Sequence, residues 1–310
     1  MELSRRHFAR LAGTAALAAP HLTGQKAPLT AQEIVDRIQK NAGVPWQPNS
    51  LDAIKAGDPS AAITGIATTG MATMDVLTRA LKDKANMVIT LEPVFYGRLD
   101  GQTPPPPPAG RAQGGRGGGR AQAGLAADDP VLAAKKEFIE KNGLVVFRFT
   151  DHWRARKPDP LIEGFVATMG WMKNRVAGDL TRFDFPNATL GGLADELAKK
   201  LPARAGIRVV GDPQTTVGRV GLLPGSSPLS ATMKVLPECD VVIAGETREW
   251  ESVEYAQDTV ASGQKKGLIM VGRMLSEQPG MSACAEWLKP LVPELKVSWI
   301  PASDPYWRPV

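Results

Sequence analysis

Short apolar runs alternate with amphipathic stretches along most of the chain. An apolar run at 63–68 is followed by a helical pattern that opens at Thr73, and Met87-Val88-Ile89 forms the next apolar run. This β-α-β spacing predicts two parallel strands, with a loop for a site at their carboxyl ends. The alternation continues to a last strand at 295–300, so the sequence predicts the α/β class.

Other elements follow from periodicity and capping signals. Thr30 with Glu33 forms a capping box and predicts a helix to about Lys40. Asp129-Pro130 predicts the start of another helix. Two apolar runs, 207–210 and 217–223, flank Gly211-Asp212-Pro213 and are expected to be paired strands. The remaining expected helices begin near Pro160, Thr189, Ser227, Glu249 and Ser276, and the remaining expected strands lie at 144–150, 240–244 and 267–271.

The first 24 residues have the pattern of an export signal. Arg5 and Arg6 precede a short run of small apolar residues, Leu11 to Ala19, as in twin-arginine signals. No polar stripe interrupts this run, which disfavours an amphipathic first helix. We therefore expect the protein to be exported through the twin-arginine route to the periplasm or the extracellular space.

Residues 101–124 differ in composition from the rest of the chain. A polyproline run leads into a tract of Gly, Arg, Ala and Gln, which lacks the apolar residues needed for a core. We interpret it as a disordered insertion within a core of residues 25–310. An RGG-like nucleic-acid tract is the alternative, and it fits an exported protein poorly.

Composition excludes several classes of protein. The hydrophobic fraction of 43% and the charged fraction of 22% are typical of a globular protein, and the net charge of +5 is mild. We therefore expect no nucleic-acid partner. No uninterrupted apolar run approaches the roughly 18 residues of a membrane span. Cys239 and Cys284 have no metal-binding spacing, and Cys239 lies beside an apolar run, which favours a buried thiol over a disulfide.

Polar residues follow four of the expected strands, at 90–93, 150–154, 245–249 and 272–277. The carboxyl ends of strands in an α/β sheet converge on one edge, which is the usual place for a site. Each cluster alone also fits a structural role as a turn or a helix cap. Motifs of serine hydrolases, zincins, P-loop proteins and dinucleotide-binding proteins are absent from the sequence.

Three of these clusters resemble the motifs of one family. Thr90-Leu91-Glu92-Pro93 is similar to a Thr-His-Glu-Pro motif, 149–154 to a strand ending in His-Asp-x-x-His, and 272–277 to Gly-His followed by Ser-Glu. With 245–251, their order resembles an exported subgroup of the dinuclear-metal family related to type 2 GTP cyclohydrolase I, also described as NGG-interacting-factor-three-like. The resemblance spans roughly residues 30–300. It implies two intertwined mixed α/β lobes, a site between them at the strand carboxyl ends, and a toroidal homo-hexamer.

The chain departs from this family at the metal ligands. Four residues stand where the resemblance places histidines: Leu91, Phe149, Arg154 and Arg273. The candidate ligands that remain are Glu92, Asp151, His152 and Glu277. A dinuclear centre needs about three protein ligands for each metal, and arginine repels a cation. We therefore expect at most one weakly held divalent ion, which could be Zn, Fe, Mn or Mg.

Two main functions remain open. In the first, the pocket of a ring-forming protein binds a small molecule through Glu246, Arg248 and Arg273, with catalysis lost or altered. In the second, the protein is a cyclohydrolase- or amidohydrolase-like enzyme that uses one divalent ion, with Glu92, His152 and Glu249 in acid–base roles. An unrelated exported α/β binding protein is a third possibility.

Arg273 is the residue expected to replace a metal. It follows Gly272 at a strand end and precedes Glu277 by four residues, so the two side chains can pair on one helical turn. Without a cation, the carboxylates of Glu92, Asp151 and Glu277 would repel one another, and a guanidinium forked between two of them would supply the missing positive charge.

Overall fold

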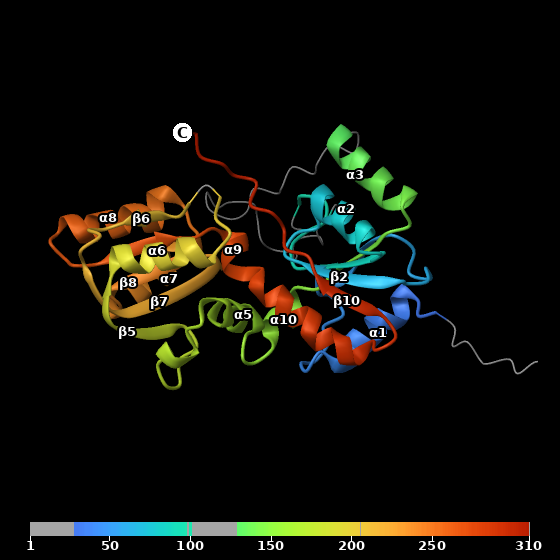
Figure 1. Ribbon diagram of the computed structural model, residues 1–310, viewed down its shortest axis with the longest axis horizontal. Coiled ribbons are helices and arrows are strands. Elements are labelled where there is room, and N and C mark those ends of the chain that lie inside the picture. Colours follow the sequence, from blue (N-terminus) through green and yellow to red (C-terminus); the bar gives the residue numbers. More distant parts are fainter. Residues whose placement is uncertain (1–27, 98, 101–128, 205, 310) are drawn as a thin grey trace, which may run out of the picture.

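The computed structural model describes residues 28–97, 99–100, 129–204 and 206–309. They form two α/β lobes that lie side by side along the longest axis (Figure 1). This arrangement confirms the predicted fold class. The predicted export signal (1–24) and the predicted insertion (101–124) lie outside the described residues.

The first lobe contains a five-stranded sheet in the described part of the chain, with the order β1-β4-β3-β2-β10. The strands are β1 (Ala53–Ala56), β2 (Gly65–Thr69), β3 (Met87–Thr90), β4 (Val145–Arg148) and β10 (Lys296–Trp299). β4, β3, β2 and β10 are parallel, and only β1 runs against its neighbour. The predicted parallel pair of β2 and β3 is thus confirmed.

The second lobe has another sheet, with the order β5-β7-β8-β9-β6. Its strands are β5 (Arg182–Thr189), β6 (Arg208–Val210), β7 (Thr216–Ser226), β8 (Val241–Glu246) and β9 (Gly267–Met270). β7, β8 and β9 are parallel, while β5 and β6 are antiparallel edge strands. The predicted pairing of β6 with β7 is wrong, because β6 pairs with β9 and β7 lies between β5 and β8.

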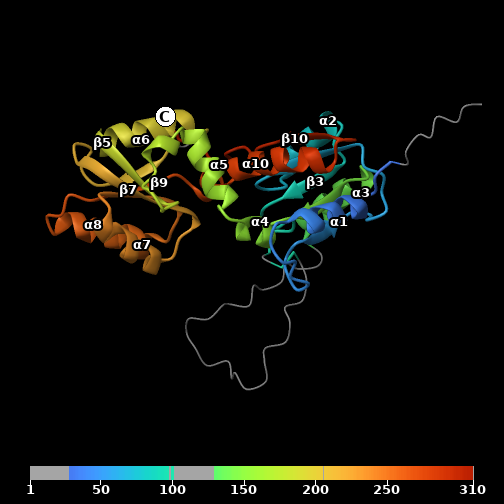
Figure 2. The ribbon, with the colours of Figure 1, turned by 90° about the horizontal axis from the view of Figure 1, so that it is seen from below.

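Helices cover both faces of each sheet (Figures 1 and 2). Their bounds are α1 (Ala31–Asn41), α2 (Met74–Lys82), α3 (Pro130–Lys141), α4 (Asp151–Ala155), α5 (Pro160–Met169), α6 (Leu190–Lys200), α7 (Leu229–Val235), α8 (Glu254–Ala261), α9 (Arg273–Glu277) and α10 (Pro279–Leu288). Short 3-10 turns occur at η2 (Met172–Asn174), η3 (Leu236–Glu238) and η5 (Lys289–Leu291), and a π-helical turn at η4 (Glu249–Val253).

Along the central strands, successive side chains belong to different hydrophobic cores, one on each face of the sheet. In β3, Met87 and Ile89 pack toward α1 and α10, whereas Val88 packs toward α2 and α3. In β8, Ile243 packs toward α5 and α6, and Val242 packs toward α7 and α8. Because successive side chains of a strand point to opposite faces, both sheets are buried on two sides.

The lobes are joined by the packing of α5 against α10. Leu161 of α5 belongs to the core of the first lobe, while Phe165 belongs to the core of the second. The two helices approach closely at Gly164 and Gly280, where a Cβ atom on Gly164 would lie 2.6 Å from the Cα of Gly280. Only glycine allows two helix backbones to meet at this distance.

Local signals placed several helix starts correctly. The Thr30 capping box is present, and Asp129 caps α3 with Pro130 in the first turn. Cys239 is free and buried, as expected, and so is Cys284. No helix among the described residues is long and apolar enough to cross a membrane.

Candidate functional site

A cleft of about 610 Å³ lies where the carboxyl ends of the two sheets face each other. Glu92 follows β3, and Asp151 and Arg154 lie on α4, directly after β4. Arg273 and Glu277 come from α9, which follows β9 in the other lobe. The cleft thus combines residues of both lobes, at the place expected from the sequence.

Glu277 is the most buried acidic group of this cleft, with 3% of its side chain exposed. Gly225, at the end of β7, has a φ of +74°, and any side chain there would overlap the Glu277 carboxylate. The Ser276 hydroxyl accepts a hydrogen bond from the Gly225 N–H at 2.9 Å and donates one to the Arg273 carbonyl. These contacts fix α9 against the strand ends and aim Glu277 into the cleft.

Arg154 forms the strongest pair with this buried acid. Its two terminal nitrogens bind the two oxygens of Glu277, one of them at 3.0 Å. Its Nη2 also donates to Glu92 at 3.3 Å. This forked geometry matches the planar guanidinium to a carboxylate.

Arg273 binds the same acids from the other side. Its Nη2 donates to Oε1 of Glu92 at 2.8 Å, and its Nε lies 3.6 Å from Oε2 of Glu277. The second contact is the expected pairing across one helical turn, since residues 273–277 are helical. Glu92 Oε1 therefore lies between two guanidinium groups.

The acids keep both arginines charged. Burial lowers the pKa of Arg154, but hydrogen bonding and the charge of Glu277 outweigh it, so the pKa lies above its usual value. Burial likewise lowers the pKa of Arg273, and the charges of Glu92 and Glu277 outweigh that effect. The site consequently holds two permanent positive charges.

Asp151 lines the cleft near its rim and is exposed. Its Oδ2 accepts a hydrogen bond from the Leu51 N–H at 2.8 Å, which holds the loop before β1 against the cleft. Arg148 and Thr150 also line this wall. The Arg148 guanidinium pairs at 3.0 Å with Asp100, and both side chains are buried.

His152 does not line the cleft. It is buried, and its ring stacks on Trp46 with centroids 3.7 Å apart. The Nδ1 atom lies 2.7 Å from Asp52, and Nε2 accepts a hydrogen bond from the Gln47 N–H at 2.8 Å. Both ring nitrogens are therefore engaged, and the prediction that His152 binds a metal or acts in catalysis does not fit this arrangement.

Asp52, which we did not single out from the sequence, explains why α4 begins where it does. Its carboxylate accepts hydrogen bonds from the backbone N–H groups of Thr150, Asp151 and His152. Free N–H groups at a helix start attract a carboxylate. The polar cluster at 150–152 thus has partly a structural role.

Leu91 and Phe149, two of the positions where the resemblance placed histidines, are core residues. Both are fully buried in the same hydrophobic cluster of the first lobe. Phe149 lies within 6 Å of the Trp153 and Trp287 rings. Neither side chain lines the cleft.

The predicted ligand-binding residues Glu246 and Arg248, and the predicted catalytic residue Glu249, divide between the border of the cleft and the surface. Glu246 contacts Arg273 at 3.4 Å and so borders the site. Arg248 pairs with Glu251 and lies over the exposed Trp250 ring. Glu249, with 72% of its side chain exposed, pairs with Arg208. Arg248 and Glu249 do not line the cleft, so the structure separates them from the other candidates.

These residues do not fit a dinuclear metal centre. Among the residues that the structure describes, no three His, Cys, Asp or Glu side chains lie close enough to hold one ion. The oxygens of Glu92 and Glu277 face guanidinium groups, which repel a cation.

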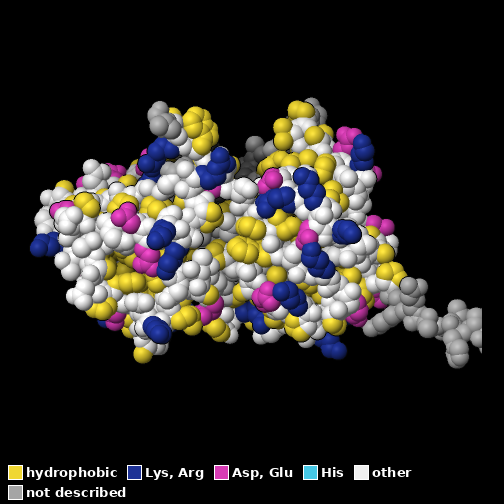
Figure 3. Space-filling model, in the orientation of Figure 1, with side chains coloured by type: hydrophobic (Ala, Val, Ile, Leu, Met, Phe, Trp, Pro, Cys, Tyr) yellow, Lys and Arg dark blue, Asp and Glu magenta, His cyan; other side chains and the backbone are white. Residues whose placement is uncertain are grey.

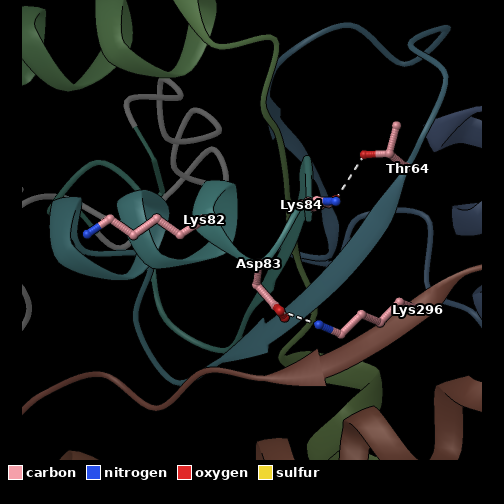
Figure 4. Close-up of a pocket in the computed structure, with 5 residues that line it drawn as sticks. All are labelled: Thr64, Lys82, Asp83, Lys84 and Lys296. Carbon is pink, nitrogen blue, oxygen red and sulfur yellow. Dashed lines mark hydrogen bonds and ion pairs between the residues drawn. The ribbon is translucent and has the colours of Figure 1, made fainter.

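A smaller depression of about 340 Å³ lies in the first lobe (Figure 4). Lys296 reaches Asp83 there, while Lys82 points away from it. The lysines are those of an ordinary solvated surface. In Figure 3, Lys and Arg side chains are interspersed with Asp and Glu over both lobes, and no single-sign patch covers this face.

Comparison with known proteins identifies the fold. No family model and no curated protein matches the sequence. Solved structures do match: a Staphylococcus aureus hypothetical protein, SA1388, has 13% identity and a TM-score of 0.61, covering 91% of this chain and 100% of that one. A Bacillus cereus protein related to NIF3 has 11% identity and a TM-score of 0.61, covering 91% and 99%. The chain has the NIF3 fold.

A protein of unknown function, ybgI, has the same fold at 18% identity and a TM-score of 0.58, covering 90% of this chain and 100% of that one. These matches extend over both lobes, which confirms the fold that the sequence motifs implied. Identities this low carry the NIF3 fold alone and leave the chemistry to the residues of the cleft.

Proposed function

We propose that the protein binds a small molecule in the cleft between its lobes, without the dinuclear metal centre that its motifs resemble. One observation carries the proposal. The two most buried acids facing the cleft, Glu92 and Glu277, are both paired with guanidinium groups. Positive charge that a metal would supply is thus already provided by Arg154 and Arg273.

The lining of the cleft supports a small ligand. Leu51, Pro93, Tyr96 and Pro224 supply apolar surface, and the guanidinium groups of Arg154 and Arg273 converge on Glu92. A volume of about 610 Å³ falls within the roughly 300–1,000 Å³ that small-molecule sites occupy. The other lining residues are polar or charged, so we expect a polar ligand.

Catalysis of the metal-dependent type is lost or altered in this proposal. His152 is engaged on both ring nitrogens, and Glu249 lies on the outer surface. The carboxylates of Glu92 and Glu277 are both engaged by arginines, so neither is free to take an acid–base role on a ligand.

Metal analysis of the purified protein tests the proposal. We expect elemental analysis to find well under one Zn, Fe, Mn or Mg ion per chain, and titration calorimetry with Zn²⁺ and Mn²⁺ to give no tight binding. Arg154→Met/Arg273→Met is the matched variant, since it frees Glu92 and Glu277 and should gain affinity for a divalent ion. Two tightly bound transition metals per wild-type chain would refute the proposal and restore the hydrolase alternative.

The proposal includes assembly and export. We propose a homo-oligomer, a hexamer as the family resemblance implies, and export through the twin-arginine route. Light scattering on residues 25–310 should give a mass several times that of one chain. A monomer throughout the micromolar range would contradict the assembly. Replacing Arg5 and Arg6 with lysine should retain the protein in the cytoplasm, which cell fractionation detects.

A further inference from the structure

Two ion pairs of the cleft cross between the lobes, in opposite directions. Arg154, from the first lobe, binds Glu277 of the second. Arg273, from the second lobe, binds Glu92 of the first. Each lobe therefore contributes one arginine and one glutamate to these two pairs, which we call the reciprocal Arg–Glu pairs.

Each lobe is otherwise built to hold together without the other. Two core clusters flank the first sheet, and two others flank the second. The main apolar contact between the lobes is that of α5 with α10. At Gly164 and Gly280 the backbones of these two helices touch, with no side chain between them. Closely packed helices of this kind can slide or pivot by small amounts while both cores stay intact.

The cleft and the helix contact are thus two separate links between the lobes. The helix contact is apolar and insensitive to salt, whereas the link across the cleft consists of charges. About a third of each arginine side chain is exposed, 32% for Arg154 and 36% for Arg273. Water and dissolved ions therefore reach this link and weaken it.

We propose that the reciprocal Arg–Glu pairs are an electrostatic latch that sets how far the cleft opens about the α5–α10 contact. With the pairs formed, the lobes are held closed over the cleft. When the charges are screened, or when a charged ligand competes for Glu92 or Arg273, the lobes separate at the cleft. This latch concerns lobe closure and holds whichever small molecule the cleft binds.

Distances between spin labels test the latch directly. Glu137 on α3 and Gln257 on α8 are exposed and lie on helices of different lobes, so Glu137→Cys and Gln257→Cys accept labels. The native thiols, Cys239 and Cys284, are buried and should remain unlabelled. Pulsed electron–electron double resonance on the full-length labelled protein, diluted with unlabelled protein so that an oligomer holds at most one labelled chain, then reports the separation of the lobes.

We expect a narrow distance distribution in low salt. At 1 M NaCl, where charges are screened beyond about 3 Å, the distribution should broaden and shift by several ångströms. The variant Arg154→Met/Arg273→Met should be broad already in low salt and should not respond to NaCl. Arg175→Met is the matched control, because Arg175 and Glu163 form a half-buried pair within the second lobe, and it should behave as wild type.

A double variant with the narrow distribution of the wild type would overturn the latch, as would a wild-type distribution unchanged by salt. If the double variant does not fold, Glu92→Gln/Glu277→Gln keeps both side-chain shapes and removes the charges that both arginines bind, so it gives the same readout. The metal content of the protein plays no part in these outcomes, which separates this test from that of the proposed function.

Discussion

The two arginines of the cleft differ in how much each stabilises the protein. Arg154 binds both oxygens of the buried Glu277, whereas Arg273 reaches that residue only at 3.6 Å. We expect Arg154→Ala to lower the free energy of unfolding by about 2–3 kcal/mol and Arg273→Ala by about 1 kcal/mol, since water reaches both groups. Urea denaturation measures both values. Arg219→Ala, which removes an exposed pair, should cost less than about 0.5 kcal/mol, and a larger loss for Arg273 than for Arg154 would contradict this ranking.

The buried lysine Lys135 makes the stability of the protein depend on pH. Lys135 of α3 is buried and donates to the Val94 carbonyl at 2.6 Å, and burial lowers its pKa to about 8, against an opposing effect of Asp100. Between pH 8 and about 10.5 the unfolded chain holds this proton more often than the folded one, so folding becomes more favourable as pH rises. Below pH 8 Lys135 is charged in both states, and burying this charge destabilises the folded protein by its full amount.

We therefore expect the free energy of unfolding of the wild type, relative to Lys135→Met, to increase by about 2–3 kcal/mol from pH 7 to pH 10. Taking the difference between the two proteins removes the contribution of other titrating groups. A difference that stays flat over this range would mean that Lys135 titrates at its ordinary pKa.

At this scale the sequence located the acids but not all their partners. Glu92, Asp151 and Glu277 were expected at converging strand ends, and the structure brings them to one cleft. The sequence shows Arg154 only as a residue in the place of a histidine. It does not show that Arg154 pairs with Glu277, because its helix, α4, is too short to show periodicity. His152 lies outside the cleft, and nothing in the sequence reveals that its ring accepts a hydrogen bond from the N–H of Gln47, 105 residues away.

Among the elements, the crossing of α5 and α10 is the most sensitive to substitution. A Cβ atom on Gly280 would lie 2.6 Å from the Cα of Leu161. Helix propensity alone predicts that Gly→Ala stabilises by about 1 kcal/mol, but overpacking costs about 1–3 kcal/mol or more. We expect Gly280→Ala to lower the melting temperature. Gly192→Ala in α6, where the nearest atom is 3.2 Å away and belongs to the Thr189 hydroxyl, should leave it unchanged or raise it.

The elements themselves were largely predictable, since capping residues and apolar periodicity are local. Thr30, Asp129 and Thr189 each cap a helix as expected. Strand pairing was less predictable, because β6 and β7 are neighbours in sequence but are separated in the sheet by β8 and β9. A turn such as Gly211-Asp212-Pro213 indicates a change of direction and does not identify the partner strand. The long edge strand β5 has mixed burial and gave no clear pattern.

In the whole molecule, the segment after β10 adds a connection between the lobes. The Pro301 carbonyl accepts a hydrogen bond from Arg79 in the first lobe, and Asp304 accepts one from the Arg204 N–H in the second. The side chains of Tyr306 and Trp307, which follow, are mostly exposed. Alternating strands and helices predicted the α/β class, but the division into two sheets depends on contacts between distant parts of the chain.

Arg154 and Arg273 also determine how the centre of the cleft is filled. An ion in equilibrium with solution dissociates on dilution, can be removed by a chelator, and stabilises its protein in proportion to the logarithm of its concentration. A guanidinium is covalently attached, so its occupancy is one per chain from the moment of synthesis. Dialysis against EDTA should leave the melting temperature unchanged, and a fall would reveal a bound ion. Every copy of the protein would then leave the ribosome with its cations in place, whatever metals the cell contains.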